Sequence, residues 1–410
     1  MSSFELLIAG LTLQAGYNSA LVTIGAALLG IAAGGCGTFV FLRRRALVSD
    51  AVAHATLPGV GIAFMLMVAF GGDGQSLPGL LAGSALSAFV GLLAVGWLTH
   101  RTRLTEDAAI GAVLSVFFGL GIVLLTVVQS MSAGRQAGLE SFLLGQTAGM
   151  LRSEAITIAA AGALCAVVVF VLRRSMTLVA FDPEYAVTTG VDVRRTDLAM
   201  MTLALVVTVI GLKVVGLILI VAMLIIPPVT ARFWTNRADR MVLVAALAGG
   251  AAGWIGAAVS TAAEALPTGP IIVLVSFAIF AISLFFSPLR GVVAAALQRV
   301  AFQRRVHLRQ GLLALARGEA IYDGYTIAVL RRRGLIRPDG IATFDGRAAA
   351  AKALRDEARW QEARRIYENE AVASRYDGLT PIEDVLAPDE IEEIDRRLGP
   401  PAAVESGGGR

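Results

Sequence analysis

Long uncharged stretches alternate with short arginine-bearing segments through the first 299 residues of this chain. An apolar helix of about 20 residues is long enough to cross the roughly 30 Å hydrocarbon core of a membrane. The runs predicted to cross are residues 19–42, 51–71, 78–99, 108–132, 154–173, 243–263 and 270–289. The fold class that follows is an all-α polytopic membrane bundle.

Residues 198–231 form a longer apolar stretch, which only Lys213 interrupts. Because this stretch is too long for one untilted crossing, we predict two short helices joined by a turn around Gly211-Leu212-Lys213. The bundle then has about eight to nine spans, depending on whether Phe4–Gln14 lies as a helix in the membrane interface.

The arginines predict the orientation, because cytoplasmic loops of membrane proteins carry an excess of basic residues. With a break at 211–213, the basic clusters fall in alternate loops: Arg43–Arg45, Arg101 and Arg103, Arg173 and Arg174 with Arg194 and Arg195, Arg232 with Arg237 and Arg240, and Arg290. These loops and the C-terminal tail are therefore expected in the cytoplasm, and the N-terminus outside. No removable signal peptide is expected.

Glu264 lies just before Pro267, in a loop that this orientation assigns to the outer mouth of the bundle. An acid at this position suits contact with an incoming cation or with a basic patch of a binding protein. A plain helix-end charge is the alternative.

Charge density separates the chain into two parts. Residues 1–299 carry 30 Asp, Glu, Lys and Arg residues, whereas the shorter stretch 300–410 carries 36. We therefore expect a transmembrane domain over residues 1–298, a polar cytoplasmic domain over 299–399 and a disordered tail over 400–410.

Small residues inside the apolar runs predict close helix packing. Gly30/Gly34 and Gly249/Gly253 have the spacing that lets two helix backbones approach. Cys36 and Cys165 both lie in apolar spans, so we expect them to be inert core residues and not a disulfide or a metal site.

Asp50 and His54 are the most informative polar residues, because ionisable groups in or beside a span tend to face a cavity or an ion path. They are one helical turn apart and point the same way. A carboxylate oxygen and an imidazole nitrogen on one face can both ligate Zn²⁺ or Mn²⁺. The alternative is structural: Ser49 or Asp50 caps a helix, and His54 is hydrogen-bonded inside the bundle.

Pro227 and Pro228 remove backbone donors near the end of a predicted span. Two interpretations remain open, because a proline pair either kinks a helix at a gate or ends it.

The polar insert 181–192 predicts a short exposed helix between two arginine pairs. Asp182 is the candidate N-cap, Pro183 the first helical residue, Glu184 a first-turn acid and Gly190 the residue that closes the helix. Such a helix suits docking to another protein, and an ordinary structured loop is the alternative.

Five segments, in this order, resemble the permease subunits of ABC transporters that import Mn²⁺, Zn²⁺ or Fe²⁺. They are GTFVFLRRRALVSDAVAHATLPG at 37–59, LLGQTAGM at 143–150, FDPEYAVTTGV at 181–191, GLILIVAMLIIPPVTARF at 216–233 and LPTGPIIVLVSFAIF at 266–280. The resemblance implies that Asp50 and His54 belong to the metal path. It also implies that the helix at 182–190 engages the ATPase subunit.

The function that the resemblance implies is that of a non-catalytic permease in the plasma membrane of a bacterium, as a multi-pass protein of the inner membrane. The chain has no GxxxxGK[ST] phosphate loop, so ATP hydrolysis requires separate ABC ATPase subunits. The other implied partners are a second permease, identical or paralogous, a periplasmic or extracellular metal-binding protein and membrane lipid. The metal ion is cargo, and no permanently bound cofactor is expected.

Two other classes of function compete with this one. An ion-coupled secondary metal transporter also has carboxylates at midplane and broken helices, and ATP dependence in liposomes separates it from an ATP-driven importer. A membrane metallohydrolase would need more than Asp50 and His54, and the chain has no HExxH motif.

The tail resembles an extension of some manganese-type permeases that is similar to metal-dependent repressors, and by this analogy favours Mn²⁺ as cargo. Helices over 306–319 and 323–333, followed by two short strands around Pro338-Asp339-Gly340, predict a winged-helix-like α+β domain. Further helices are expected around Trp360, from a capping box at Thr380, and up to Gly399.

Nucleic acid is not an expected partner of the tail, although Arg331–Arg333 precede the predicted wing. Attachment to a membrane domain and the many acids at 383–395 favour contacts with protein instead. His307 is the one histidine of the tail, which has no cysteine, so a repressor-like metal sensor is not expected either.

Overall fold

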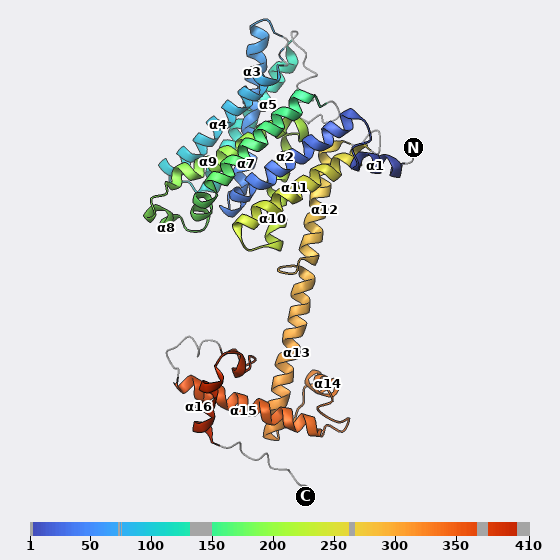
Figure 1. The fold of residues 1–410 in the computed structure, drawn as a ribbon. Coiled ribbons are helices and arrows are strands. Elements are labelled where there is room, and N and C mark those ends of the chain that lie inside the picture. The colour runs from blue at the N-terminus through green and yellow to red at the C-terminus, as the bar shows by residue number, and fades with distance from the viewer. Residues whose placement is uncertain are drawn as a thin grey trace. The chain divides into compact units, whose positions relative to one another are not determined.

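The computed structural model describes residues 3–72, 74, 76–131, 150–261, 267–366 and 376–399. The chain divides into two compact units, Met1–Ala294 and Ala295–Arg410. The helices of the first unit, shown in Figure 1, are α1 (Ser3–Leu11), α2 (Tyr17–Leu42), α3 (Ala46–Ala69), α4 (Leu77–Arg101), α5 (Glu106–Ser130), α7 (Arg152–Phe181), α8 (Pro183–Thr188), α9 (Val193–Val215), α10 (Leu217–Trp234), α11 (Ala238–Thr261) and α12 (Thr268–Phe286). The division between the units lies inside α13 (Val292–Arg317), so charge density changes within a continuous helix.

Eight of the described helices are long and apolar enough to cross a membrane: α2, α3, α4, α5, α7, α9, α11 and α12. Helix α10 is apolar but shorter. The predicted polytopic helical bundle is confirmed. The break in the stretch 198–231 is not at 211–213, as predicted, but at Gly216, which ends α9 with φ +89°. A residue with a side chain rarely adopts this backbone conformation, so glycine determines where the helix ends.

Helices α2 and α11 run side by side with their backbones in close contact (Figure 1). A Cβ atom on Gly30 would collide with the carbonyl oxygen of Gly249, and one on Gly34 with that of Ala245. The predicted packing role of the glycine pairs is therefore confirmed. Because the colliding atoms are backbone, no side-chain rearrangement can make room.

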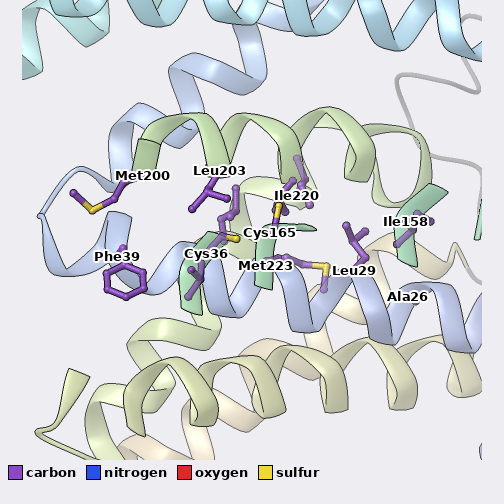
Figure 2. Close-up of a cluster of buried hydrophobic side chains, with 14 of the residues drawn as sticks. Ala26, Leu29, Cys36, Phe39, Ile158, Cys165, Met200, Leu203, Ile220 and Met223 are labelled. Carbon is purple, nitrogen blue, oxygen red and sulfur yellow. The ribbon is translucent and has the colours of Figure 1, made fainter. Parts of the chain in front are cut away.

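A cluster of buried apolar side chains joins α2, α7, α9 and α10 (Figure 2). Phe39, Leu29 and Met223 are among its fully buried members. Cys36 of α2 and Cys165 of α7 also lie in it as free, buried thiols that contact each other. The expectation that both cysteines are core residues without a disulfide is confirmed.

Pro227 and Pro228 lie inside α10, which continues past both of them to Trp234. The interpretation that the pair ends a helix is therefore wrong. Pro228 has no N–H to donate to the carbonyl of Leu224, one turn earlier. That carbonyl lies against Gly37 of α2, where any Cβ would collide with it. The proline pair thus accompanies close packing of α10 on α2, and its role as a gate stays a prediction.

Among its described residues, the second unit contains the rest of α13 and the elements α14 (Gly324–Arg332), α15 (Phe344–Ile366), the 3₁₀ helix η2 (Ile382–Asp384) and α16 (Pro388–Leu398). The predicted capping box at Thr380 is not formed: Pro381 is the N-cap of a single 3₁₀ turn, with no side-chain cap hydrogen bond, and the full helix predicted there is absent. Hydrogen bonds from Arg359 of α15 hold the pKa of the Asp395 carboxyl of α16 below its usual range. This charged pair ties the last helix to the unit.

The predicted α+β character of this unit is wrong for its described residues, which contain no strand. The turn at Pro338-Asp339-Gly340 is present, with Gly340 at φ +86°, but it closes only one antiparallel bridge, between Ile336 and Ala342. The bridge is formed by hydrogen bonds from the Arg337 amide to the Ile341 carbonyl oxygen at 2.8 Å and from the Thr343 amide to the Leu335 carbonyl oxygen at 3.0 Å. The pairing ends there, because α15 begins directly after Thr343. The Thr343 hydroxyl accepts a hydrogen bond from the Gly346 amide at 3.1 Å.

Trp360 is the largest fully buried side chain of the second unit, and its alanine substitution should unfold that unit locally. The indole packs among Ile382, Leu386 and Ile394, and its Nε1 donates to the Thr380 carbonyl oxygen at 2.9 Å. We expect Trp360→Ala to cost about 3–5 kcal/mol of unfolding free energy. Limited proteolysis of the full-length chain measures this as faster cleavage of the second unit.

Tyr322→Ala is the matched control, because Tyr322 is an aromatic residue of the same unit that is almost fully exposed. Equal cleavage rates for the two variants would contradict the role of Trp360 in the core.

Candidate metal path

Helix α3 begins earlier than predicted, and this decides the interpretation of Asp50. Its first residue is Ala46 and its N-cap is Arg45, with no side-chain cap hydrogen bond. Ser49 and Asp50 therefore lie inside the helix, and the interpretation that one of them caps it is wrong. The Asp50 carboxylate is left available for another partner.

Asp50 and His54 face each other along α3, as their spacing predicts. Asp50 Oδ1 lies 3.5 Å from His54 Nε2, and the two side chains are 41% and 19% exposed. The carboxylate is thus the more accessible of the two groups, and the imidazole lies deeper. An ion that arrives from the accessible side meets oxygen first and nitrogen next.

The second ring nitrogen of His54, Nδ1, is buried and has no hydrogen-bond partner among the described residues. The ring packs edge-on against Phe118 of α5, with centroids 5.1 Å apart. The neighbouring Ser49 hydroxyl is also buried and unpartnered within the described part of the chain. Unsatisfied buried polar atoms are rare in proteins, because each one loses its water without compensation. The second structural interpretation, a hydrogen-bonded core histidine, is therefore not supported at Nδ1.

Pro58 is a residue of this site that the sequence analysis did not single out. It lies inside α3, one turn after His54. Because proline has no N–H, the backbone carbonyl of His54 loses its helical hydrogen bond. The signal was present in the sequence as a proline four residues after the histidine.

Asp50 and His54 together present two atoms of the kind that ligate divalent metal ions, one carboxylate oxygen and one imidazole nitrogen. Among the residues that the structure describes, no group of three or more His, Cys, Asp or Glu side chains could hold a metal ion. A resident zinc or manganese site needs a fuller set of protein ligands. Two ligands suit an ion in transit, which must bind well enough to enter and weakly enough to leave.

An ion-pair network positions the start of α3. The α2–α3 elbow carries Arg44 in the left-handed region at φ +59°. Its neighbours Arg43 and Arg45 both bind Asp197 of α9, at 2.9 and 3.2 Å, and Arg45 also binds Glu106 of α5 at 2.6 Å. These partly buried contacts link three parts of the bundle at the arginine-bearing end of the spans.

The predicted short helix after the fifth described span is present as α8. Asp182 Oδ1 accepts a hydrogen bond from the Tyr185 amide at 2.9 Å, Pro183 is the first helical residue, and Gly190 has φ +82°. Glu184, Tyr185 and Val187 are exposed on it. The local geometry agrees with the expectation, whereas docking stays a prediction. Glu264 lies outside the described residues.

The sequence and the structure were compared with known proteins. Residues 18–287 match the ABC 3 transport family. The chain is 41% identical over 328 residues to the manganese transport system membrane protein MntC of Bacillus subtilis, covering 78% of this chain and 73% of the relative. It is 37% identical over 294 residues to the zinc transport system membrane protein TroC of Treponema pallidum, covering 72% and 96%.

The fold resembles that of a solved complex, PsaBC from Streptococcus pneumoniae with Fab. The TM-score is 0.59 at 28% identity, covering 70% of this chain and 96% of that one. The family match spans α2 to α12, which includes both Asp50 and His54. This chain therefore belongs to the ABC 3 transport family.

Proposed function

We propose that this chain is the membrane permease subunit of an ATP-driven importer of divalent transition metal ions, with Mn²⁺ as the cargo. The relatives named for manganese and zinc transport support the class of cargo. A mixed oxygen and nitrogen ligand pair suits Mn²⁺, Fe²⁺ and Zn²⁺ alike. The choice of Mn²⁺ therefore rests on the relatives.

The observation that carries the proposal is the state of Asp50 and His54. Both are ionisable groups on an apolar helix, neither caps it, and His54 Nδ1 has no partner in the described structure. Ionisable residues that membrane helices retain without a structural partner mark ion pathways. ATP-driven movement of the bundle then exposes this pair to one side of the membrane and afterwards to the other.

Reconstituted vesicles test the transport class directly. The chain, its ATPase partner and the binding protein are placed in liposomes, and uptake of Mn²⁺, Zn²⁺ and Fe²⁺ is measured with and without ATP. We expect ATP-dependent uptake with Mn²⁺ preferred. Uptake that follows an imposed proton or sodium gradient without ATP would show a secondary transporter instead.

We propose that α8 is the contact through which the ATPase drives the bundle. The helix is short, capped at both ends and exposed on its acidic and aromatic positions, and it follows directly on α7 and precedes α9. Its buried residue, Ala186, anchors it to the bundle. A short, rigid, exposed helix between two spans can pass a movement of the ATPase on to those spans.

Glu184→Arg is expected to uncouple the two subunits, because it reverses a charge on the exposed face of α8. Co-purification of the ATPase should fall about tenfold, equivalent to about 1.4 kcal/mol of binding free energy. Asp107→Arg is the matched control, since Asp107 is an exposed first-turn acid of α5. Full ATPase recovery with Glu184→Arg, together with normal uptake, would place the contact elsewhere.

We propose that the second unit is a cytoplasmic module that stabilises or regulates the complex and does not sense metal. Three of its carboxylates are paired with arginines: Asp356 and Glu357 with Arg309, at 3.0 and 2.8 Å, and Asp395 with Arg359. Deleting the unit should change assembly or the control of uptake. Tight stoichiometric binding of Mn²⁺ or Fe²⁺ to this unit would contradict the proposal.

A further inference from the structure

A cavity of about 710 Å³ lies at the arginine-bearing end of the bundle, between α4, α9 and the α2–α3 elbow. Its inner wall holds Arg43 and Arg45, whose charges are matched by Asp197 and Glu106. The positive charge that remains comes from Arg101 and Arg194, at the rim of the cavity. Neither of these arginines has an acidic partner among the described residues.

The acids nearest to these rim arginines along the chain have other partners or lie outside the cavity lining. Asp192 pairs with Arg195 at 3.1 Å and caps α9 through the Arg195 amide. Asp107 does not line the cavity. Arg101 and Arg194 are both exposed, so their guanidinium groups are free to meet an anion.

Apart from Thr99 and His100 of α4, the other walls of the cavity are apolar. Leu93 and Trp97 of α4 and Leu198 of α9 line it, and all three are exposed in the described structure. Tryptophan favours the membrane interface, where its ring contacts both the acyl chains and the headgroups of lipids. The cavity thus has a cationic rim beside an apolar wall, a combination that matches the phosphate and the acyl chain of a phospholipid.

We infer that this cavity binds the headgroup of an anionic phospholipid, with the phosphate at Arg101 and Arg194 and an acyl chain along Leu93 and Trp97. Guanidinium groups recognise phosphate through paired hydrogen bonds and remain charged at all relevant pH values. Basic pockets between membrane helices suit such headgroups. A free phosphate shares the anionic chemistry but cannot use the apolar wall.

Binding at this position has a structural consequence for α3. The inner wall of the cavity is the network of Arg43, Arg45, Asp197 and Glu106, which holds the elbow from which α3 starts. A bound headgroup stabilises this corner of the bundle. Lipid retention and thermal stability therefore both report on the site, and neither requires metal transport.

The test uses the full-length chain in nanodiscs of phosphatidylcholine, with and without phosphatidylglycerol. Wild-type protein should retain phosphatidylglycerol through delipidation, measured by mass spectrometry, and should unfold at a higher temperature when this lipid is present. Each arginine near an anionic lipid contributes a factor of about five, so Arg101→Gln with Arg194→Gln should weaken retention on the order of 25-fold.

The control is Arg103→Gln with Arg195→Gln, which removes the same net charge from the same two segments but from residues outside the cavity lining. We expect the Arg103→Gln/Arg195→Gln variant to retain the lipid. Trp97→Ala should weaken retention of the lipid, because it removes part of the apolar wall. Inorganic phosphate added to phosphatidylcholine nanodiscs should leave the unfolding temperature unchanged.

Three results would overturn the inference. Equal losses in the two double variants would indicate general surface charge. Stabilisation by phosphate alone would indicate an anion site without lipid. No retention and no shift in unfolding temperature for the wild type would exclude a lipid site even if the variants fail to fold.

Discussion

Asp50→Ala and His54→Ala are each expected to abolish ATP-driven metal uptake while the chain still inserts and assembles. Each substitution removes one of the two side chains on α3 that we propose as ligands of the ion. The loss of folding stability is small, because neither side chain caps the helix and His54 Nδ1 makes no hydrogen bond to any described residue. We expect initial uptake rates to fall by at least about 100-fold, because loss of a partner of a metal ligand alone costs about 10–100-fold in metal affinity or activity.

Uptake of Mn²⁺ into vesicles or cells that express each variant at matched levels measures this effect. Asp107→Ala is the control for loss of a carboxylate, since Asp107 is exposed at the start of α5 and does not contact His54. Co-purification of the ATPase shows that assembly is intact. Normal uptake by both the Asp50 and the His54 variants would remove these residues from the path.

Gly30→Val is expected to prevent correct packing of the bundle. The new Cβ would collide with the carbonyl oxygen of Gly249 across the α2–α11 contact, and a backbone atom of a packed helix cannot move aside. Overpacking of a tight core costs about 1–3 kcal/mol, and the upper end or beyond applies when the obstacle is backbone. Thermal unfolding in detergent and the yield of monodisperse protein measure this loss.

Gly111→Val is the matched control, because Gly111 lies in the interior of α5 and has no atom within 4 Å of the position of its Cβ. Both variants undergo the same change in helix propensity, so the difference between their unfolding temperatures reports the effect of the collision alone. If the two unfold at the same temperature, the α2–α11 contact is looser than the structure shows.

Most of the membrane spans were predictable because they depend on local properties. Whether a helix crosses a membrane depends on the length and polarity of one segment, so α4, α5 and α7 follow from their uncharged runs. The short helix α8 was predictable for a related reason. Its N-cap at Asp182 and its end at Gly190 use hydrogen bonds and backbone angles within a few residues.

The wrong predictions concern places where distant segments compete for the same residues. The second unit contains a turn at Pro338-Asp339-Gly340, but α15 begins directly after Thr343, so the pairing ends after a single bridge. Pro227 and Pro228 do not end α10, which continues to Trp234 and packs closely on α2 at Gly37. Local propensity alone predicts neither outcome.

For the metal path, the sequence by itself determined that Asp50 and His54 share a face, because residues one helical turn apart point the same way in any helix. Only the tertiary structure decided that α3 starts at Ala46, that His54 Nδ1 lies buried without a partner beside Phe118, and that Asp197 anchors the elbow. These features depend on contacts between segments far apart in the chain. Such contacts are determined by the packing of the whole bundle, which cannot be predicted from a local pattern of residues.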